Sequence, residues 1–145
     1  MAASAAEGAD AIVLDSSFLI AWYNARDSHH AAATRGMALV ATGKWGRALL
    51  LEYVFLEVVT VLVARLGAPS AIEVGRRLLE VDELEFVACS EFFGEAVREF
   101  SAQRASTLSF TDAAIAVVAR ARTAGRVATF DADFRGLPRI TVLPA

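Results

Sequence analysis

The sequence predicts an α/β domain of three layers, in which a central parallel sheet lies between helices. Short apolar runs alternate with longer helical stretches along the chain. The first of these runs, "AIVL", is apolar at every residue and is followed by Asp15, as expected of a strand that is buried on both faces of a parallel sheet. The chain has 145 residues, of which 56% are hydrophobic and 21% charged. This length and composition indicate one globular domain.

The first half of the chain is expected to contribute two strands and three helices. The strand "AIVLD" ends at Asp15, and "SSFLIAWYNARD" follows as a helix with Ser16 or Ser17 as its N-cap. A helix over 29–40 is stopped by "ATGKWG", and "RALLL" is the next strand. The segment "EYVFLEVVTVLVARLG", which begins at Glu52, is rich in Val, but its length favours a helix.

The segment "PSAIEVGRRLLEVD" predicts a helix, because Ser70 and Glu73 have the spacing of a capping box before an amphipathic run. "LEFVA" is then read as a strand. Residues 90–104 form an amphipathic helix in this interpretation, and its apolar side chains are expected to face inward. These side chains are Phe92, Phe93, Val97 and Phe100.

The clearest helical pattern is "SFTDAAIAVVARARTAG". Thr111 is predicted to cap this helix, Asp112 lies in its first turn and Gly125 ends it. "RVATFD" repeats the opening pattern of an apolar strand followed by an acid, here Asp131, and "RITVLP" is the last strand.

Four acids are placed where they can converge. Asp15 and Asp131 each follow a strand, and ligands of such sheets bind beyond the carboxyl ends of the strands. Asp112 begins a helix, and Glu57 lies on an otherwise apolar helix. Clustered carboxylates repel one another, and a divalent cation relieves this repulsion. Because the donors are all oxygens, and no zinc-like spacing of Cys or His occurs, Mg²⁺ or Mn²⁺ is expected.

These motifs resemble those of PIN domains, specifically the VapC-type ribonuclease toxins of bacterial toxin–antitoxin pairs. The resemblance rests on "IVLDSSFLIAW", "EYVFLEVVTVL", "LSFTDAAIAVVAR" and "VATFDADF", in this order, and extends from Ala11 to Pro144. It implies a Rossmann-like sheet of about five parallel strands. It also implies that residues 11–145 are a single nuclease domain. The segment "MAASAAEGAD" over residues 1–10 is itself expected to be a flexible tail.

The resemblance assigns roles to individual residues. Asp15, Glu57, Asp112 and Asp131 correspond to the four catalytic acids of the family. Asp15 and Asp112 are expected to bind the metal directly, whereas the other two act directly, through water or on a second ion. The supporting residues are Ser17 at a small polar position, Thr111 as a cap that orients Asp112, and Asp133 as a substitute or assistant for Asp131.

The resemblance also implies partners: an RNA substrate such as tRNA or rRNA, a small antitoxin, and a second copy of the chain in a homodimer. A cytoplasmic location without a membrane span is expected. The N-terminus lacks the pattern of a secretory signal, no apolar run approaches the roughly 20 residues of a span, and Cys89 is the only cysteine.

Alternative readings remain at this point. Glu57 would have a structural role if it formed an ion pair with an arginine such as Arg65. Glu52 is a helix-terminal acid, a residue that supports the site, or a solvent-facing side chain. The histidines at 29 and 30 are expected to be exposed or capping. A phospho-acceptor receiver domain would need a late lysine, but Lys44 is the only lysine. A binding scaffold that has lost catalysis is the other alternative.

Overall fold

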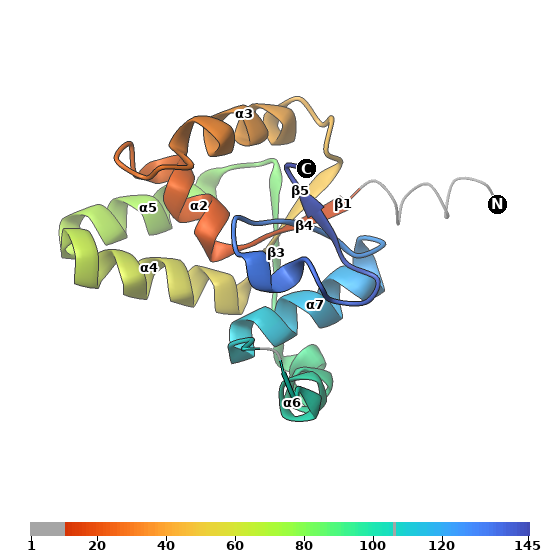
Figure 1. The fold of residues 1–145 in the computed structure, drawn as a ribbon. Coiled ribbons are helices and arrows are strands. Elements are labelled where there is room, and N and C mark those ends of the chain that lie inside the picture. The colour runs from red at the N-terminus through yellow and green to blue at the C-terminus, as the bar shows by residue number, and fades with distance from the viewer. Residues whose placement is uncertain (1–10, 106) are drawn as a thin grey trace.

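The computed structural model describes residues 11–105 and 107–145, so the predicted tail over 1–10 lies outside the described residues. Five parallel strands form one sheet in the order β3-β2-β1-β4-β5 (Figure 1). The predicted parallel sheet is confirmed. Its strands are β1 (Ala11–Leu14), β2 (Arg47–Leu51), β3 (Leu84–Val87), β4 (Arg126–Ala128) and β5 (Thr141–Leu143).

Helices cover both faces of this sheet, as the prediction of three layers requires. In Figure 1, α2 and α3 lie on one side of the sheet, and α6 and α7 lie on the other. No helix in the described residues is both long and apolar enough to cross a membrane. The helices are α2 (Ser16–Tyr23), α3 (His30–Ala41), α4 (Glu52–Leu66), α5 (Ala68–Glu80), α6 (Phe93–Ala102) and α7 (Phe110–Arg122).

Burial explains the uninterrupted apolar runs of β1 and of residues 48–51 in β2. All residues of β1 are 0% exposed, and residues 48–51 of β2 are at most 1% exposed. A side chain on either face of these strands meets a helix rather than water, so the alternation of polar and apolar residues is lost. The alanine-rich centre of α7 is also buried. Small side chains there allow close contact with the sheet.

The winding of the sheet reverses at β1, which pairs with β2 on one side and with β4 on the other. The chain thus leaves β1 in one direction and returns later to its opposite side. The backbone N–H of Asp15 donates to the carbonyl of Ala128 at 3.0 Å, across this switch point. Residues that directly follow β1 and β4 therefore lie side by side, where ligands bind in sheets of this kind.

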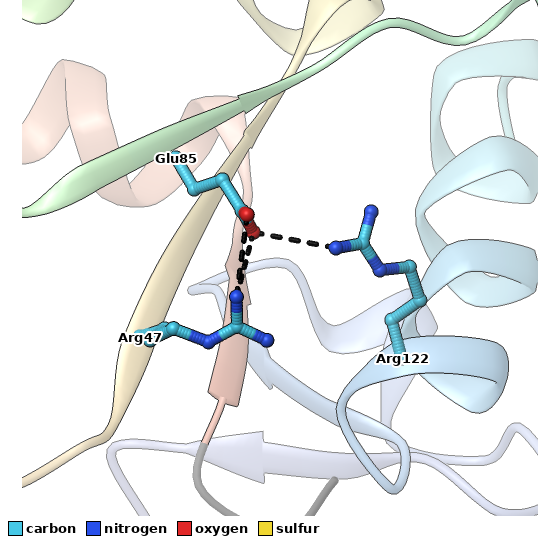
Figure 2. A network of polar contacts seen from close by, with 3 residues as sticks. All are labelled: Arg47, Glu85 and Arg122. Atoms are coloured by element: carbon cyan, nitrogen blue, oxygen red, sulfur yellow. Dashed lines mark hydrogen bonds and ion pairs between the residues drawn. The ribbon is translucent and has the colours of Figure 1, made fainter. Parts of the chain in front are cut away.

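Ion pairs tie the elements together at the opposite, amino edge of the sheet. Figure 2 shows the carboxylate of Glu85 between the guanidinium groups of Arg47 and Arg122. The N–O distances are 3.2 Å and 3.3 Å. These side chains are partly exposed, so each pair contributes only about 0–1 kcal/mol to stability. The network links β2, β3 and the end of α7.

Two predicted helix starts are wrong. Neither Ser16 nor Ser17 is the N-cap of α2, because Asp15 occupies that position and both serines lie in the first turn. Helix α5 begins at Ala68 rather than after Ser70. Pro69 lies in its first turn, where a fixed φ favours helix and the missing N–H has no helical partner to lose.

The orientation predicted for residues 90–104 is also wrong for most of its apolar side chains. Helix α6 starts after a short 3₁₀ turn (Ser90–Phe92), and only Ala96 is buried on it. Phe92 packs against the core. The helix packs on α7 rather than on the sheet, so its other large side chains stay near the surface. Phe93, Val97 and Phe100 are 52%, 38% and 41% exposed.

Candidate active site

A cavity of about 410 Å³ opens at the switch point of the sheet, and all four predicted acids line it. Asp15 follows β1, Glu57 projects from α4, Asp112 from the first turn of α7, and Asp131 follows the end of β4. A larger hollow of about 590 Å³ lies between α6 and α7, away from the strand ends. The smaller cavity is the candidate site because it collects the acids.

Asp15 is held by hydroxyl groups. It is 2% exposed. The hydroxyls of Ser17 and Thr129 donate to its Oδ2 at 2.8 Å and 2.7 Å. Burial raises the pKa of the carboxyl, while these two hydrogen bonds lower it and the charge of Glu57 raises it. The predicted support from Ser17 therefore has a geometric basis, and Thr129 is a second support that the sequence reading missed.

Glu57 is tied to Asp15 through one serine. The hydroxyl of Ser16 donates to Glu57 Oε1 at 3.0 Å and lies 3.4 Å from Asp15 Oδ1. In the described residues no ion pair joins Glu57 to Arg65, although both line the cavity. The alternative of a structural Glu57–Arg65 pair is therefore not observed.

Asp112 is fixed by a capping box at the start of α7. Ser109 Oγ accepts from the backbone N–H of Asp112, and Asp112 Oδ2 accepts from the N–H of Ser109, both at 3.1 Å. Ser109 is thus the N-cap, and the prediction that Thr111 caps the helix is wrong. Thr111 lies two residues further on, within the helix, where a side-chain cap is no longer needed.

The acids affect each other electrostatically. Burial raises the pKa of Asp112 to about 6, and the charges of Asp15 and Asp131 contribute to the rise, while hydrogen bonds from Ser109 oppose it. Like charges repel at short range, so the effect of Asp15 and Asp131 on Asp112 indicates that these three carboxylates lie close together. A cation placed among them would reverse the effect.

Of the two acids in "DAD", Asp131 lines the cavity and Asp133 does not. The backbone N–H of Asp131 donates to Thr129 Oγ1 at 2.9 Å, which fixes the chain at this point. The carboxylate of Asp133 is exposed and accepts from the hydroxyl of Thr107 at 3.1 Å. Geometry therefore favours Asp131 as the fourth acid.

Glu52 has a structural contact outside this cavity. Its Oε1 accepts from the backbone N–H of Cys89 at 3.0 Å, and it is absent from the residues that line the cavity. The contact links the start of α4 to the segment after β3. Glu52 is therefore neither purely solvent-facing nor part of the acid cluster.

The donor set suits a hard divalent cation, since it consists of carboxylate oxygens supported by hydroxyls. Among the described residues, no three His, Cys, Asp or Glu side chains are arranged to hold one metal ion as they stand. Burial is the main cause of the raised pKa of Asp112, and the charges of Asp15 and Asp131 add to it. A bound cation would offset both contributions by stabilising the ionised carboxylates.

Three hydroxyl residues of the site escaped the sequence reading: Ser16, Ser109 and Thr129. A signal exists for two of them. "SFTD" has a capping-box spacing from Ser109 to Asp112. Thr129 stands two residues before Asp131, at the same strand end. The bridging role of Ser16 depends on the approach of α4, which local sequence does not report.

Comparisons with known proteins agree with this geometry. The model of the PIN domain family matches residues 12–140. The crystal structure of Mycobacterium tuberculosis VapC20, described as a sarcin–ricin loop cleaving toxin, has a TM-score of 0.77 and 25% sequence identity to this chain. The match covers 89% of this chain and 96% of that chain. No match was found among curated proteins.

Proposed function

Since the chain belongs to the PIN domain family, as a member of the VapC type, we propose that it is an endoribonuclease toxin that depends on a divalent metal. One observation carries the proposal: four acids from separate parts of the chain line a single cavity at the switch point of the sheet. The similarity to VapC20, a toxin that cleaves the sarcin–ricin loop, supports RNA as the substrate.

Asp15 and Asp112 are the proposed direct ligands of Mg²⁺ or Mn²⁺. Both are buried, and neither has an arginine or lysine partner in the described residues. Glu57 and Asp131 would bind the same ion, bind through water, or hold a second one. When bound, the ion would neutralise the carboxylates and polarise the phosphodiester.

In the proposed reaction, hydroxyl residues orient the carboxylate of Asp15, and a second acid accepts a proton. Ser17 and Thr129 fix Oδ2 of Asp15. Its Oδ1 has the longer contact of 3.4 Å from the Ser16 hydroxyl and is the oxygen proposed to bind the ion. Glu57 and Asp131 are half-buried and line the cavity, although they are far apart in the sequence. One of them takes the proton of the attacking water as its oxygen bonds to phosphorus. The ester bond in line then breaks, and the leaving oxygen is protonated from solvent.

A small antitoxin and a homodimer belong to the same proposal. The exposed apolar side chains of α6, Phe93, Val97 and Phe100, are where we expect a second copy to pack. The rings of Phe93 and Phe100 pack against the ring of Phe110, at centroid distances of 5.6 Å and 5.9 Å. Light scattering of the wild-type chain and of Val97→Glu tests this: we expect a dimer and a monomer, respectively.

A cytoplasmic location of the protein also remains a prediction.

Cleavage of RNA tests the proposed function. Wild-type protein and the Asp15→Asn variant are incubated with Mg²⁺ and two substrates, a sarcin–ricin loop hairpin and total tRNA. We expect the wild type to produce discrete new 5′ ends, and Asp15→Asn or EDTA to abolish them. The matched control is Asp82→Asn, an exposed acid between α5 and β3. Equal cleavage by Asp15→Asn and wild type, or cleavage in EDTA, would contradict the proposal.

A further inference from the structure

A stack of three aromatic rings leads from the core to the mouth of the acid-lined cavity. Phe18 is 0% exposed, and its ring lies 5.9 Å from that of Phe130 at an interplanar angle of 23°. The ring of Phe130 lies 4.4 Å from that of His29, at an angle of only 4°. Phe130 and His29 line the cavity, whereas Phe18 does not, and Phe130 directly precedes Asp131. The stack is thus anchored in the core and ends beside the acids.

The ring of His29 is held in place yet accessible. The carboxylate of Asp27 accepts from the backbone N–H of His29 at 2.8 Å, which fixes the turn before α3. Phe130 covers one face of the imidazole, and His29 as a whole is exposed. The other face is therefore free to receive a flat group. In the described residues, the His29 side chain makes no hydrogen bond or ion pair of its own. The neighbouring His30, by contrast, bonds the carbonyl of Ala21 through Nδ1 at 2.8 Å.

Arg65 adds a positive charge to the same cavity. It is the only arginine or lysine among the described residues that line it. It is exposed, and no hydrogen bond or ion pair joins it to another described residue. A cavity that holds four carboxylates repels phosphate, so a free guanidinium at its wall favours the approach of a polyanion.

We propose that these residues form a nucleotide subsite, in which one unpaired RNA base stacks on His29 and an adjacent phosphate contacts Arg65. This inference rests on the proposed function and names the class of substrate: RNA with an unpaired base beside the cleaved bond. Stacking on an aromatic ring tolerates any base, but it requires that the base leave the helix. The subsite therefore selects loops, bulges and single strands over duplex RNA. His29 is a positioning residue in this account and takes no part in the chemistry.

Binding of a defined RNA tests the subsite. The probe is a single-stranded decamer of mixed sequence that carries 2-aminopurine, and cleavage is prevented by Asp15→Asn in every protein compared. We expect His29→Ala to weaken binding about tenfold. It should also abolish the quenching of 2-aminopurine fluorescence. His29→Phe keeps the flat ring and should bind within about twofold of the parent, which separates stacking from hydrogen bonding. Arg65→Ala should weaken binding and reduce by about 1 the slope of log K against log salt concentration, as expected for the loss of one phosphate contact.

Controls decide between the subsite and a general effect. A blunt duplex of the same sequence should bind His29→Ala and its parent alike. Equal affinity of the parent and His29→Ala for the decamer would overturn the subsite, as would an equal loss for decamer and duplex. In the chain with Asp15 intact, His29→Ala should raise KM and leave kcat unchanged. If the chain with Asp15 intact cleaves RNA and His29→Ala changes neither KM nor kcat, the proposed subsite is wrong and the proposed nuclease activity is retained. If the chain with Asp15 intact cleaves no RNA, the proposed nuclease activity itself is wrong.

Discussion

The substitution Asp112→Asn is expected to make the metal-free protein more stable while it removes activity. Asp112 is 8% exposed, and its burial together with the charges of Asp15 and Asp131 raises its pKa from 3.8 to about 6. Asparagine is neutral and has nearly the same shape. Its side-chain oxygen still accepts from the N–H of Ser109, so the cap of α7 is retained.

The raised pKa sets both the sign and the size of the effect. Below pH 3.8 the carboxyl of Asp112 is protonated in folded and unfolded chains alike, so it contributes nothing. Between pH 3.8 and about 6 the folded chain keeps a proton that the unfolded chain has lost, and stability falls as the pH rises. Above about pH 6 the ionised carboxylate of Asp112 lowers the free energy of unfolding by its full amount, which is at most about 3 kcal/mol. We therefore expect Asp112→Asn to gain about 1–3 kcal/mol at pH 7.

Urea unfolding in EDTA measures this gain. The free energies of unfolding of wild type and Asp112→Asn are compared at pH 7 and at pH 4, where the difference should shrink toward zero. Asp82→Asn, which removes an exposed charge, should change stability by less than about 0.5 kcal/mol at either pH. The reasoning is refuted if Asp112→Asn is no more stable than wild type at pH 7, or if its gain persists undiminished at pH 4.

Further predictions concern the support of the site and the turns. Thr129→Val removes the hydroxyl that donates to Asp15 Oδ2 at 2.7 Å, and should slow RNA cleavage by about 10- to 100-fold. An unchanged rate would contradict that support. Ser109→Ala should cost about 1 kcal/mol in urea unfolding, whereas Thr111→Ala should cost less than about 0.5; the reverse order would restore Thr111 as the cap. At Gly125, where φ is 82°, an added Cβ would overlap a backbone carbonyl oxygen, so Gly125→Ala should cost more than about 2 kcal/mol. Gly43→Ala, at φ 76° with open space around it, is the control and should cost about 1 kcal/mol. Equal losses at these two glycines would contradict the steric argument.

The fold was predictable because the strands leave a strong local signal. Residues 11–14 and 48–51 are short runs that are apolar without interruption, as is typical of strands in a sheet covered on both faces. The acids that follow β1 and β4 were predictable for the same reason, because the ends of parallel strands share one edge. That Asp131 rather than Asp133 enters the cavity depends on the turn after Thr129, which the alternation of residues in "DAD" does not specify.

The cap of α7 was predicted wrongly, and exposed faces were less predictable because neighbours in space decide them. In "SFTD" either Ser109 or Thr111 is a suitable cap by residue type, and the capping-box spacing from Ser109 to Asp112, which the prediction did not use, distinguishes them. The apolar side of α6 indicated burial, yet this helix lies outside α7 and leaves Phe93 half exposed. The contact of His29 with Phe130 joins residues from separate turns. No periodicity in the sequence reports such a pair.

The central claim is that the four acids act together through a shared divalent cation. Calorimetric titration of Mn²⁺ into the metal-free protein at pH 7.5 tests it most directly. We predict saturable binding by the wild type and by Asp82→Asn, and its loss in Asp15→Asn. Absence of saturable binding to the wild type, or undiminished binding to Asp15→Asn, would contradict the claim.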